Sequence, residues 1–171
     1  GKRFPLIVTG SSWNEALLRD YGIERVRTVL QGVDPTHFHP APRLGVMPNR
    51  FLVFSGGKAE PRKGQDIVLA AFKVFAKRHP DAMLVTAWHN AWVQSARELD
   101  RSGLAAPVVV KQNNRLDISG WAAASGIPSH QFVDLGCGPN TFLPAILREM
   151  DVAVFPNRAE GPFARFVGLV V

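Results

Sequence analysis

The segment FLVFSGGKAEPRKGQD, residues 51–66, gathers the side chains best suited to bind an anion. Its apolar start predicts a strand buried on both faces, and Gly56 and Gly57 predict a sharp turn where a ligand can approach the backbone closely. Lys58, Arg62 and Lys63 precede a predicted helix whose first N–H groups have no partner within the helix. Cations beside a helix N-terminus attract anions, so the segment predicts a site for a phosphate or diphosphate.

A solvated basic turn is the alternative interpretation of this segment, since spacing alone does not separate it from a phosphate site. The segment is not a P-loop, because no Lys-Ser or Lys-Thr pair closes it, and its glycines do not follow G-x-G-x-x-G. The helix that follows is well marked. Val68, Ala71, Phe72 and Phe75 keep helical spacing, and Pro80 predicts its end.

A second glycine motif, VDLGCGPN, spans residues 133–140. It resembles the first motif of S-adenosylmethionine-dependent methyltransferases, in which glycines after a strand make room for the cofactor. Asn140 stands at the third glycine, and the motif lies late in the chain although it normally opens the methyltransferase sheet. The plain interpretation of Gly136 and Gly138 is a tight strand-to-helix turn.

Composition favours a folded domain that binds small anions. The chain has 171 residues, of which 46% are hydrophobic, so a sizeable core is expected and disorder is not. No apolar run reaches membrane-spanning length, although peripheral membrane contact is left open. The single cysteine excludes an internal disulfide and a cysteine metal cluster, and it fits a cytoplasmic protein. The net charge of +6 is spread along the chain, which argues against a nucleic-acid surface.

Strand and helix patterns alternate along the chain and predict an α/β fold, a Rossmann-like doubly wound parallel sheet. Residues 31–49 are rich in Pro and Gly and predict a linker between two domains. Ligands bind such sheets at the carboxyl ends of their strands, where Gly56, Gly136 and Pro156 fall. The predicted strands are residues 6–9, 26–30, 51–54, 82–87, 107–111, 131–135 and 152–155, and the predicted helices include 13–21, 92–102, 121–125 and 141–150.

Five segments, taken together and in order, resemble the second half of retaining GT-B glycosyltransferases of the group 1, family 4-like type. They are SSWNEALLRDYGI, VRTVLQGVDPTHFHP, FSGGKAEPRKGQDIVLAAF, RHPDAMLV and DVAVFPNRAEG. The resemblance implies a tail of the acceptor-side domain with its linker at residues 1–40. It implies a nucleotide-sugar donor-binding domain at residues 41–171, incomplete at its C-terminus.

The resemblance also assigns roles to residues in the basic segment. The family's two diphosphate-binding cations fall on Lys58 and Lys63, with Arg62 as a supporting cation. Lysine stands at position 58 where arginine is commoner, so a point charge replaces a bidentate clamp. Gly56 and Gly57 would let the donor approach closely.

Other roles fall on the later part of the chain. Leu135 and Gly136 would lie on the base and ribose side of the donor pocket. Glu160 begins the family's acidic motif and would lie beside the donor sugar as the catalytic residue. The second glutamate of that motif is missing, because position 168 is glycine and no acidic residue follows Glu160. The chain is therefore expected to be a fragment that binds a nucleotide weakly and does not transfer sugar by itself.

The function that the resemblance implies is transfer of a sugar from a nucleotide-sugar donor to an unidentified acceptor, with retention of configuration. Fixed cations would stabilise the charge on the departing diphosphate, so no metal and no other cofactor is expected. The D-x-D motif of metal-dependent transferases is absent, and the five histidines are dispersed. Two alternatives stay open, namely a nucleotide-binding module without catalysis and, third, an S-adenosylmethionine-dependent methyltransferase.

Overall fold

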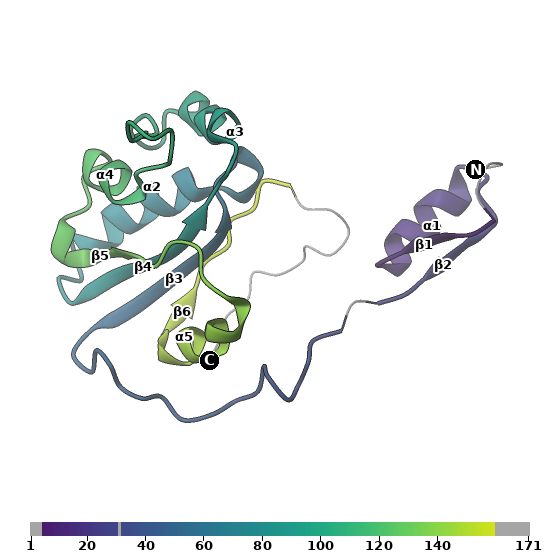
Figure 1. Cartoon of the computed structure of the whole chain (residues 1–171), viewed down its shortest axis with the longest axis horizontal. Coiled ribbons are helices and arrows are strands. Elements are labelled where there is room, and N and C mark those ends of the chain that lie inside the picture. The colour runs from purple at the N-terminus through teal and green to yellow at the C-terminus, as the bar shows by residue number, and fades with distance from the viewer. Residues whose placement is uncertain (1–4, 31, 160–171) are drawn as a thin grey trace. The chain divides into compact units, whose positions relative to one another are not determined.

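The computed structural model describes residues 5–30 and 32–159, and these fall into two compact units that divide between Phe38 and His39 (Figure 1). The division lies within the Pro- and Gly-rich stretch, which contains neither helix nor strand in its described part. That the two units are an acceptor-side tail and a donor-binding domain stays a prediction.

The N-terminal unit is a short β-α-β element. Strands β1 (Ile7–Thr9) and β2 (Val26–Thr28) pair in parallel, and helix α1 (Ser12–Asp20) connects them. Ser11 caps α1 by accepting a hydrogen bond from the N–H of Asn14 at 3.2 Å. Glu15 does not complete a capping box with Ser12. Its carboxylate accepts instead from the Thr28 hydroxyl at 2.7 Å and from Arg19 at 2.9 Å.

The larger unit contains a parallel four-stranded sheet with the order β5-β4-β3-β6. Its strands are β3 (Phe51–Lys58), β4 (Ala82–His89), β5 (Phe132–Asp134) and β6 (Val152–Ala153). The chain runs outward from β3 through β4 to β5, then returns to place β6 on the other side of β3. This reversal between β3 and β6 is the switch point of a Rossmann-like sheet.

Helices cover both faces of this sheet, as a doubly wound fold requires (Figure 1). Helices α2 (Gln65–Ala76), α3 (Val93–Arg97) and α4 (Ile118–Ala124) contribute to a core with Val53 and Leu84. Helix α5 (Leu143–Glu149) packs against the opposite core of Leu52, Phe54 and Val85. Short 3-10 turns complete the unit, at η1 (Pro61–Lys63), η2 (Glu98–Ser102), η3 (Ser129–Gln131) and η4 (Asn140–Phe142).

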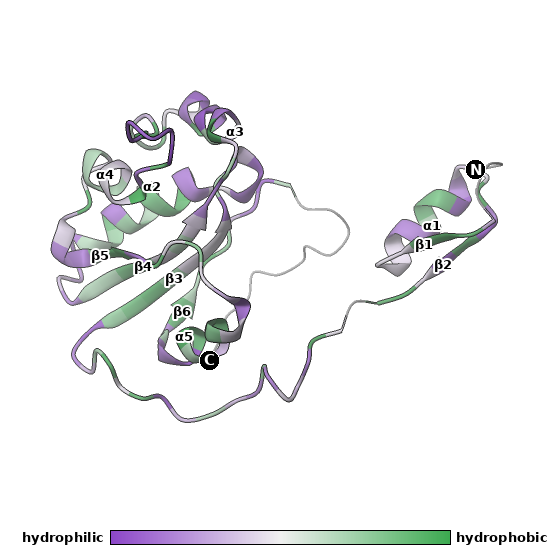
Figure 2. Cartoon of the chain, viewed as in Figure 1, coloured by the Kyte–Doolittle hydropathy of each residue, from purple (hydrophilic) through white to green (hydrophobic). Residues whose placement is uncertain are grey.

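The side chains of each central strand point alternately into these two cores, which explains the apolar runs in the sequence. Successive side chains of a strand point to opposite faces, and both faces of β3 are covered. Figure 2 shows β3 and β4 as hydrophobic over most of their length, with hydrophilic residues gathered at the loops. The predicted α/β class and parallel doubly wound sheet are therefore confirmed.

The predicted turn at the glycine pair is wrong. Gly56 and Gly57 lie inside β3, which continues to Lys58 and pairs with β4 as far as His89. Because β4 continues beside the two glycines, their backbone lies within the sheet and is stabilised by hydrogen bonds that a turn would lack. The chain turns instead at Gly64, which has a φ of 73° and precedes α2.

The predicted strand at residues 107–111 is also wrong. Among the described residues this stretch forms only an antiparallel bridge between Val110 and Leu116. The N–H of Lys111 donates to the carbonyl of Arg115, and the N–H of Asp117 donates to that of Val109. The backbone groups that would have joined the sheet are thus paired with the residues that follow directly in the chain.

One acidic side chain fixes the part of the linker that belongs to the larger unit. The carboxylate of Glu149, at the end of α5, accepts hydrogen bonds from the backbone N–H groups of Leu44, Gly45 and Val46. The bonds from Leu44 and Val46 are the main reason why the pKa of Glu149 lies below its ordinary value. Within the described residues, the helices are too short and too polar to cross a bilayer.

Candidate functional site

A cavity of about 880 Å³ opens at the carboxyl ends of β3, β4 and β5. Phe155, just past β6, also lines it, so the cavity adjoins the switch point between β3 and β6. This is the position where open parallel sheets bind their ligands. Six of the residues predicted from the sequence line the cavity, namely Gly56, Gly57, Lys58, Lys63, Leu135 and Gly136. Arg62 is not among the lining residues, and Glu160 lies outside the described residues.

The two strand glycines leave the backbone of β3 bare where it meets the cavity. Gly57 has a φ of 119°, a conformation that side chains disfavour, and no other atom lies within 4 Å of where its Cβ would be. A Cβ on Gly56 would lie 3.0 Å from the ring of Phe54. Both glycines line the cavity although the chain does not turn there, and their role in binding a diphosphate stays a prediction.

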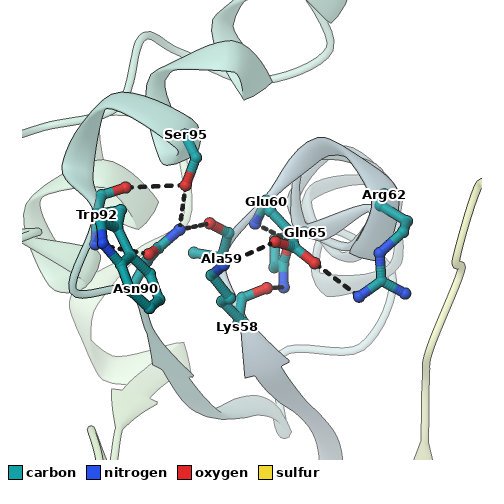
Figure 3. A network of polar contacts seen from close by, with 8 residues as sticks. All are labelled: Lys58, Ala59, Glu60, Arg62, Gln65, Asn90, Trp92 and Ser95. Atoms are coloured by element: carbon teal, nitrogen blue, oxygen red, sulfur yellow. Dashed lines mark hydrogen bonds and ion pairs between the residues drawn. The ribbon is translucent and has the colours of Figure 1, made fainter.

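Lys58 is held by two side chains at the rim of the cavity. Its Nζ lies 3.2 Å from the carboxylate of Glu60 and 4.6 Å from the ring centre of Trp92. Arg62 binds the same carboxylate at 2.7 Å, so Glu60 bridges two of the three predicted cations (Figure 3). The exposed ring of Trp92 thus belongs to the cavity wall, whereas Trp88 is buried in the core.

Glu60 is a site residue that sequence reasoning missed. Burial acts to raise its pKa, but hydrogen bonds and charge from Lys58 and Arg62 outweigh burial and hold the pKa below its ordinary value. The carboxylate is therefore charged at neutral pH and competes with any anionic ligand for Lys58. No regular spacing in the sequence marks this carboxylate, because Lys58 ends β3 whereas Arg62 lies in the 3-10 turn η1.

Lys63 ends η1 and reaches the cavity from the turn before α2. Gly64 makes this turn possible, since a Cβ at this position would collide with the carbonyl oxygen of Pro156. The close packing brings the N-terminus of α2 against the segment that follows β6.

A partly buried ion pair joins the same two segments. Asp66, in the first turn of α2, is bound by both terminal nitrogens of Arg158. The backbone N–H groups of Arg158 and Ala159 in turn donate to the carbonyl of Arg62, at 2.9 and 3.5 Å. The positive electrostatic potential at the N-terminus of α2 is therefore partly compensated by a carboxylate of the protein itself.

The loop after β5 forms the opposite wall of the cavity. Leu135 and Gly136 lie there, and Gly136 has a φ of 67°. Asp134, the acidic residue of the VDLGCGPN motif, accepts from the Thr86 hydroxyl at 2.6 Å and from the N–H of Trp88 at 3.3 Å. Its carboxylate is thus engaged with β4, and Cys137 is an exposed residue of this loop.

No group of three His, Cys, Asp or Glu side chains within residues 5–30 and 32–159 is arranged to hold a metal ion. The titratable side chains that line the cavity are instead those of Lys58, Lys63, His89 and Cys137. The cavity can bind an anion through the fixed positive charges of its lysines and through the backbone at the end of β3, where the two glycines carry no side chain.

No protein-family model and no curated protein sequence matches this chain. Several solved structures, however, match this chain. A sucrose-phosphate synthase from Thermosynechococcus elongatus is 18% identical, with a TM-score of 0.65, over 91% of this chain and 35% of its own length. An E. coli trehalose-6-phosphate structure bound with UDP-2-fluoro glucose is 11% identical, with a TM-score of 0.61, over 92% of this chain and 41% of its own. A complex of TarM from S. aureus that includes UDP is 10% identical, with a TM-score of 0.55, over 91% of this chain and 26% of its own.

The chain therefore spans between about a quarter and two fifths of the length of these structures. At such low identity the likeness concerns the fold, and it agrees with the strand order and the helix layers described above. The chain has the Rossmann-like fold of part of a GT-B glycosyltransferase, as its sequence predicted.

Proposed function

We propose that the larger unit binds the nucleotide-sugar donor of a glycosyltransferase. The observation that carries this proposal is the cavity at the switch point, where Lys58 and Lys63 stand beside the bare glycine end of β3. Two of the similar structures are described with UDP or a UDP-sugar analogue, which supports a nucleoside diphosphate as the ligand class.

The proposed chemistry is departure of the diphosphate from the sugar. Breaking that bond leaves negative charge on the phosphate that carried the sugar, and fixed cations stabilise this charge in the transition state. Lys58 and Lys63 would supply the cations without a metal, with Arg62 supporting them through the carboxylate of Glu60. Glu160 would lie beside the sugar, and the transfer would proceed with retention. The single cysteine supports a cytoplasmic setting.

A nucleotide-binding module without catalysis is the second candidate. It is favoured by the fact that the whole cavity is built from residues of one unit. The methyltransferase is less favoured, because its glycine motif follows β5, the outermost described strand on that side, rather than β3 at the switch point.

Titration calorimetry with UDP, uridine and S-adenosylmethionine tests the proposal. We expect UDP to bind, uridine to bind much more weakly because it lacks the diphosphate, and S-adenosylmethionine not to bind. Equal affinity for uridine and UDP would refute the role of the cations. Binding of S-adenosylmethionine alone would overturn the glycosyltransferase proposal in favour of the methyltransferase.

A further inference from the structure

Two buried amide side chains, Gln65 and Asn90, bind the backbone of residues 58–60 (Figure 3). They are 1% and 3% exposed. A buried amide is costly unless its polar atoms are hydrogen-bonded, so two of them around one short segment call for an explanation.

Gln65 acts like a neighbouring strand toward this segment. Its Nε2 donates to the carbonyl of Lys58 at 2.8 Å, and its Oε1 accepts from the N–H of Glu60 at 3.2 Å. The residues on both sides of Ala59 are thereby fixed by one side chain at the start of α2.

Asn90 binds the same segment from the side of β4. Its Nδ2 donates to the carbonyl of Ala59 at 2.6 Å and to the hydroxyl of Ser95 at 2.9 Å. Its Oδ1 accepts from the N–H of Trp92 at 2.8 Å. Both donors and the acceptor are engaged, so the amide has one favoured orientation and links the segment after Lys58 to the turn that carries Trp92.

The contacts of Lys58 depend on these backbone positions. Its side chain is long and flexible, and it is held in place by Glu60 at 3.2 Å and by the ring of Trp92 at 4.6 Å. Gln65 fixes the backbone at Lys58 and Glu60, and Asn90 fixes Ala59 and Trp92. We propose that Gln65 and Asn90 are positioning residues that hold Lys58 beside Glu60 and over Trp92 at the cavity rim. Their effect on donor binding rests on the proposed function.

Gln131 provides a matched control for a purely structural amide. It is 4% exposed, and its Nε2 donates to the carbonyls of His79, Pro80 and Ala82 at 3.2, 3.3 and 3.2 Å. These groups lie at the amino ends of β4 and β5, away from the cavity at the carboxyl ends. Gln65→Met, Asn90→Leu and Gln131→Met each replace a buried amide by an apolar side chain of similar volume.

The first measurement is made on the free protein and needs no ligand. The methylene protons next to Nζ of Lys58 lie close to the indole ring, so NMR should show them shifted by its ring current, and Lys58→Ala assigns the signal. Gln65→Met and Asn90→Leu should move this signal toward the position of a solvated lysine, while Gln131→Met should leave it unchanged. Ser95→Ala, which removes one partner of Asn90 but no buried amide, should give a smaller change and serves if the stronger variants fail to fold.

The second measurement is a UDP titration of the same variants. Gln65→Met and Asn90→Leu should raise the dissociation constant about fivefold, as expected for one misplaced contact. In a Lys58→Ala background they should raise it less than about twofold, because a positioning residue acts through the residue that it positions. A residue that only stabilises the fold would not lose its effect in that background.

Three results would overturn the inference, namely an unchanged Lys58 signal in both amide variants, an equal change in Gln131→Met, or additive effects with Lys58→Ala. Failure of the unsubstituted protein to bind UDP would overturn the proposed function instead. In that case the NMR signal of Lys58 still decides whether the two amides position it.

Discussion

Lys63 offers the most direct test of donor binding at the scale of a single residue, because it lines the cavity from the turn just before α2. Lys63→Ala should remove a charge-assisted contact to the diphosphate of roughly 1.5–3 kcal/mol, which raises the dissociation constant for UDP about tenfold or more. Salt should weaken the binding of the unsubstituted protein more than that of the variant. Titration calorimetry at two salt concentrations measures both effects.

Lys77→Ala is the matched control for this substitution. Lys77 is an exposed lysine at the opposite end of α2, so its removal changes the net charge equally without touching the cavity. If Lys63→Ala keeps full affinity, or if both variants lose the same amount, Lys63 does not bind the diphosphate.

Gly64 lies close to the backbone of Pro156. Gly64→Ala should destabilise the larger unit more than Gly103→Ala, although the two glycines have similar φ values of 73° and 65°. Both variants incur the cost of a side chain in the left-handed region, about 1–2 kcal/mol, but only a Cβ at Gly64 collides with the backbone of Pro156. Urea unfolding compares them, and equal losses would show that this collision is relieved without cost.

At the scale of elements, the ion pair of Asp66 with Arg158 joins α2 to the segment after β6. Arg158→Met should lower the free energy of unfolding by about 2 kcal/mol, below the 3–5 kcal/mol of a fully buried pair because the Arg158 side chain is 35% exposed. Arg101→Met is the control, since Arg101 forms an exposed pair with Glu98 at 2.6 Å and should matter little. Similar losses in both variants would contradict a special role for Arg158.

The same pair predicts how stability depends on pH. Burial acts to raise the pKa of Asp66, but hydrogen bonds from Arg158 and Ser102 together with the charge of Arg158 outweigh it and leave the pKa below its ordinary value of 3.8. A lowered folded-state pKa gives a contribution that is complete above 3.8 and is lost as the pH falls through the folded-state value. Acid should therefore destabilise the unsubstituted protein more than Arg158→Met, as a series of urea unfolding curves would show. Parallel pH curves for the two proteins would exclude this contribution.

At the scale of the whole molecule, the chain spans between about a quarter and two fifths of the glycosyltransferase structures that it resembles. Transfer requires donor and acceptor to be held together in a productive geometry. We therefore expect residues 1–171 to bind UDP but to transfer no sugar from UDP-sugars to candidate acceptors. An assay of UDP release tests this, and turnover that Lys58→Ala abolishes would show that the chain is sufficient for catalysis.

The class of fold and most of its elements could be predicted from the order of the residues. The apolar runs of β3 and β4 and the helical spacing along α2 are local patterns, so they can be recognised without knowledge of the residues that pack against them. Strands that alternate with helices favour parallel pairing through crossover connections, from which the doubly wound sheet follows. Six cavity residues were also predictable, since the carboxyl ends of parallel strands meet at one edge of the sheet.

How those cavity residues are held depends on contacts between segments that are distant in the sequence. Whether Gly56 and Gly57 form a turn or extend β3 depends on β4, which continues beside them to His89 and supplies their partners. The roles of Glu60, Gln65 and Asn90 arise in the same way. Asn90 and Ala59 are 31 positions apart, and they meet because the register of the two strands aligns Lys58 with His89. A hydrogen bond between distant residues has no local pattern in the sequence, so the sheet must form before these partners exist.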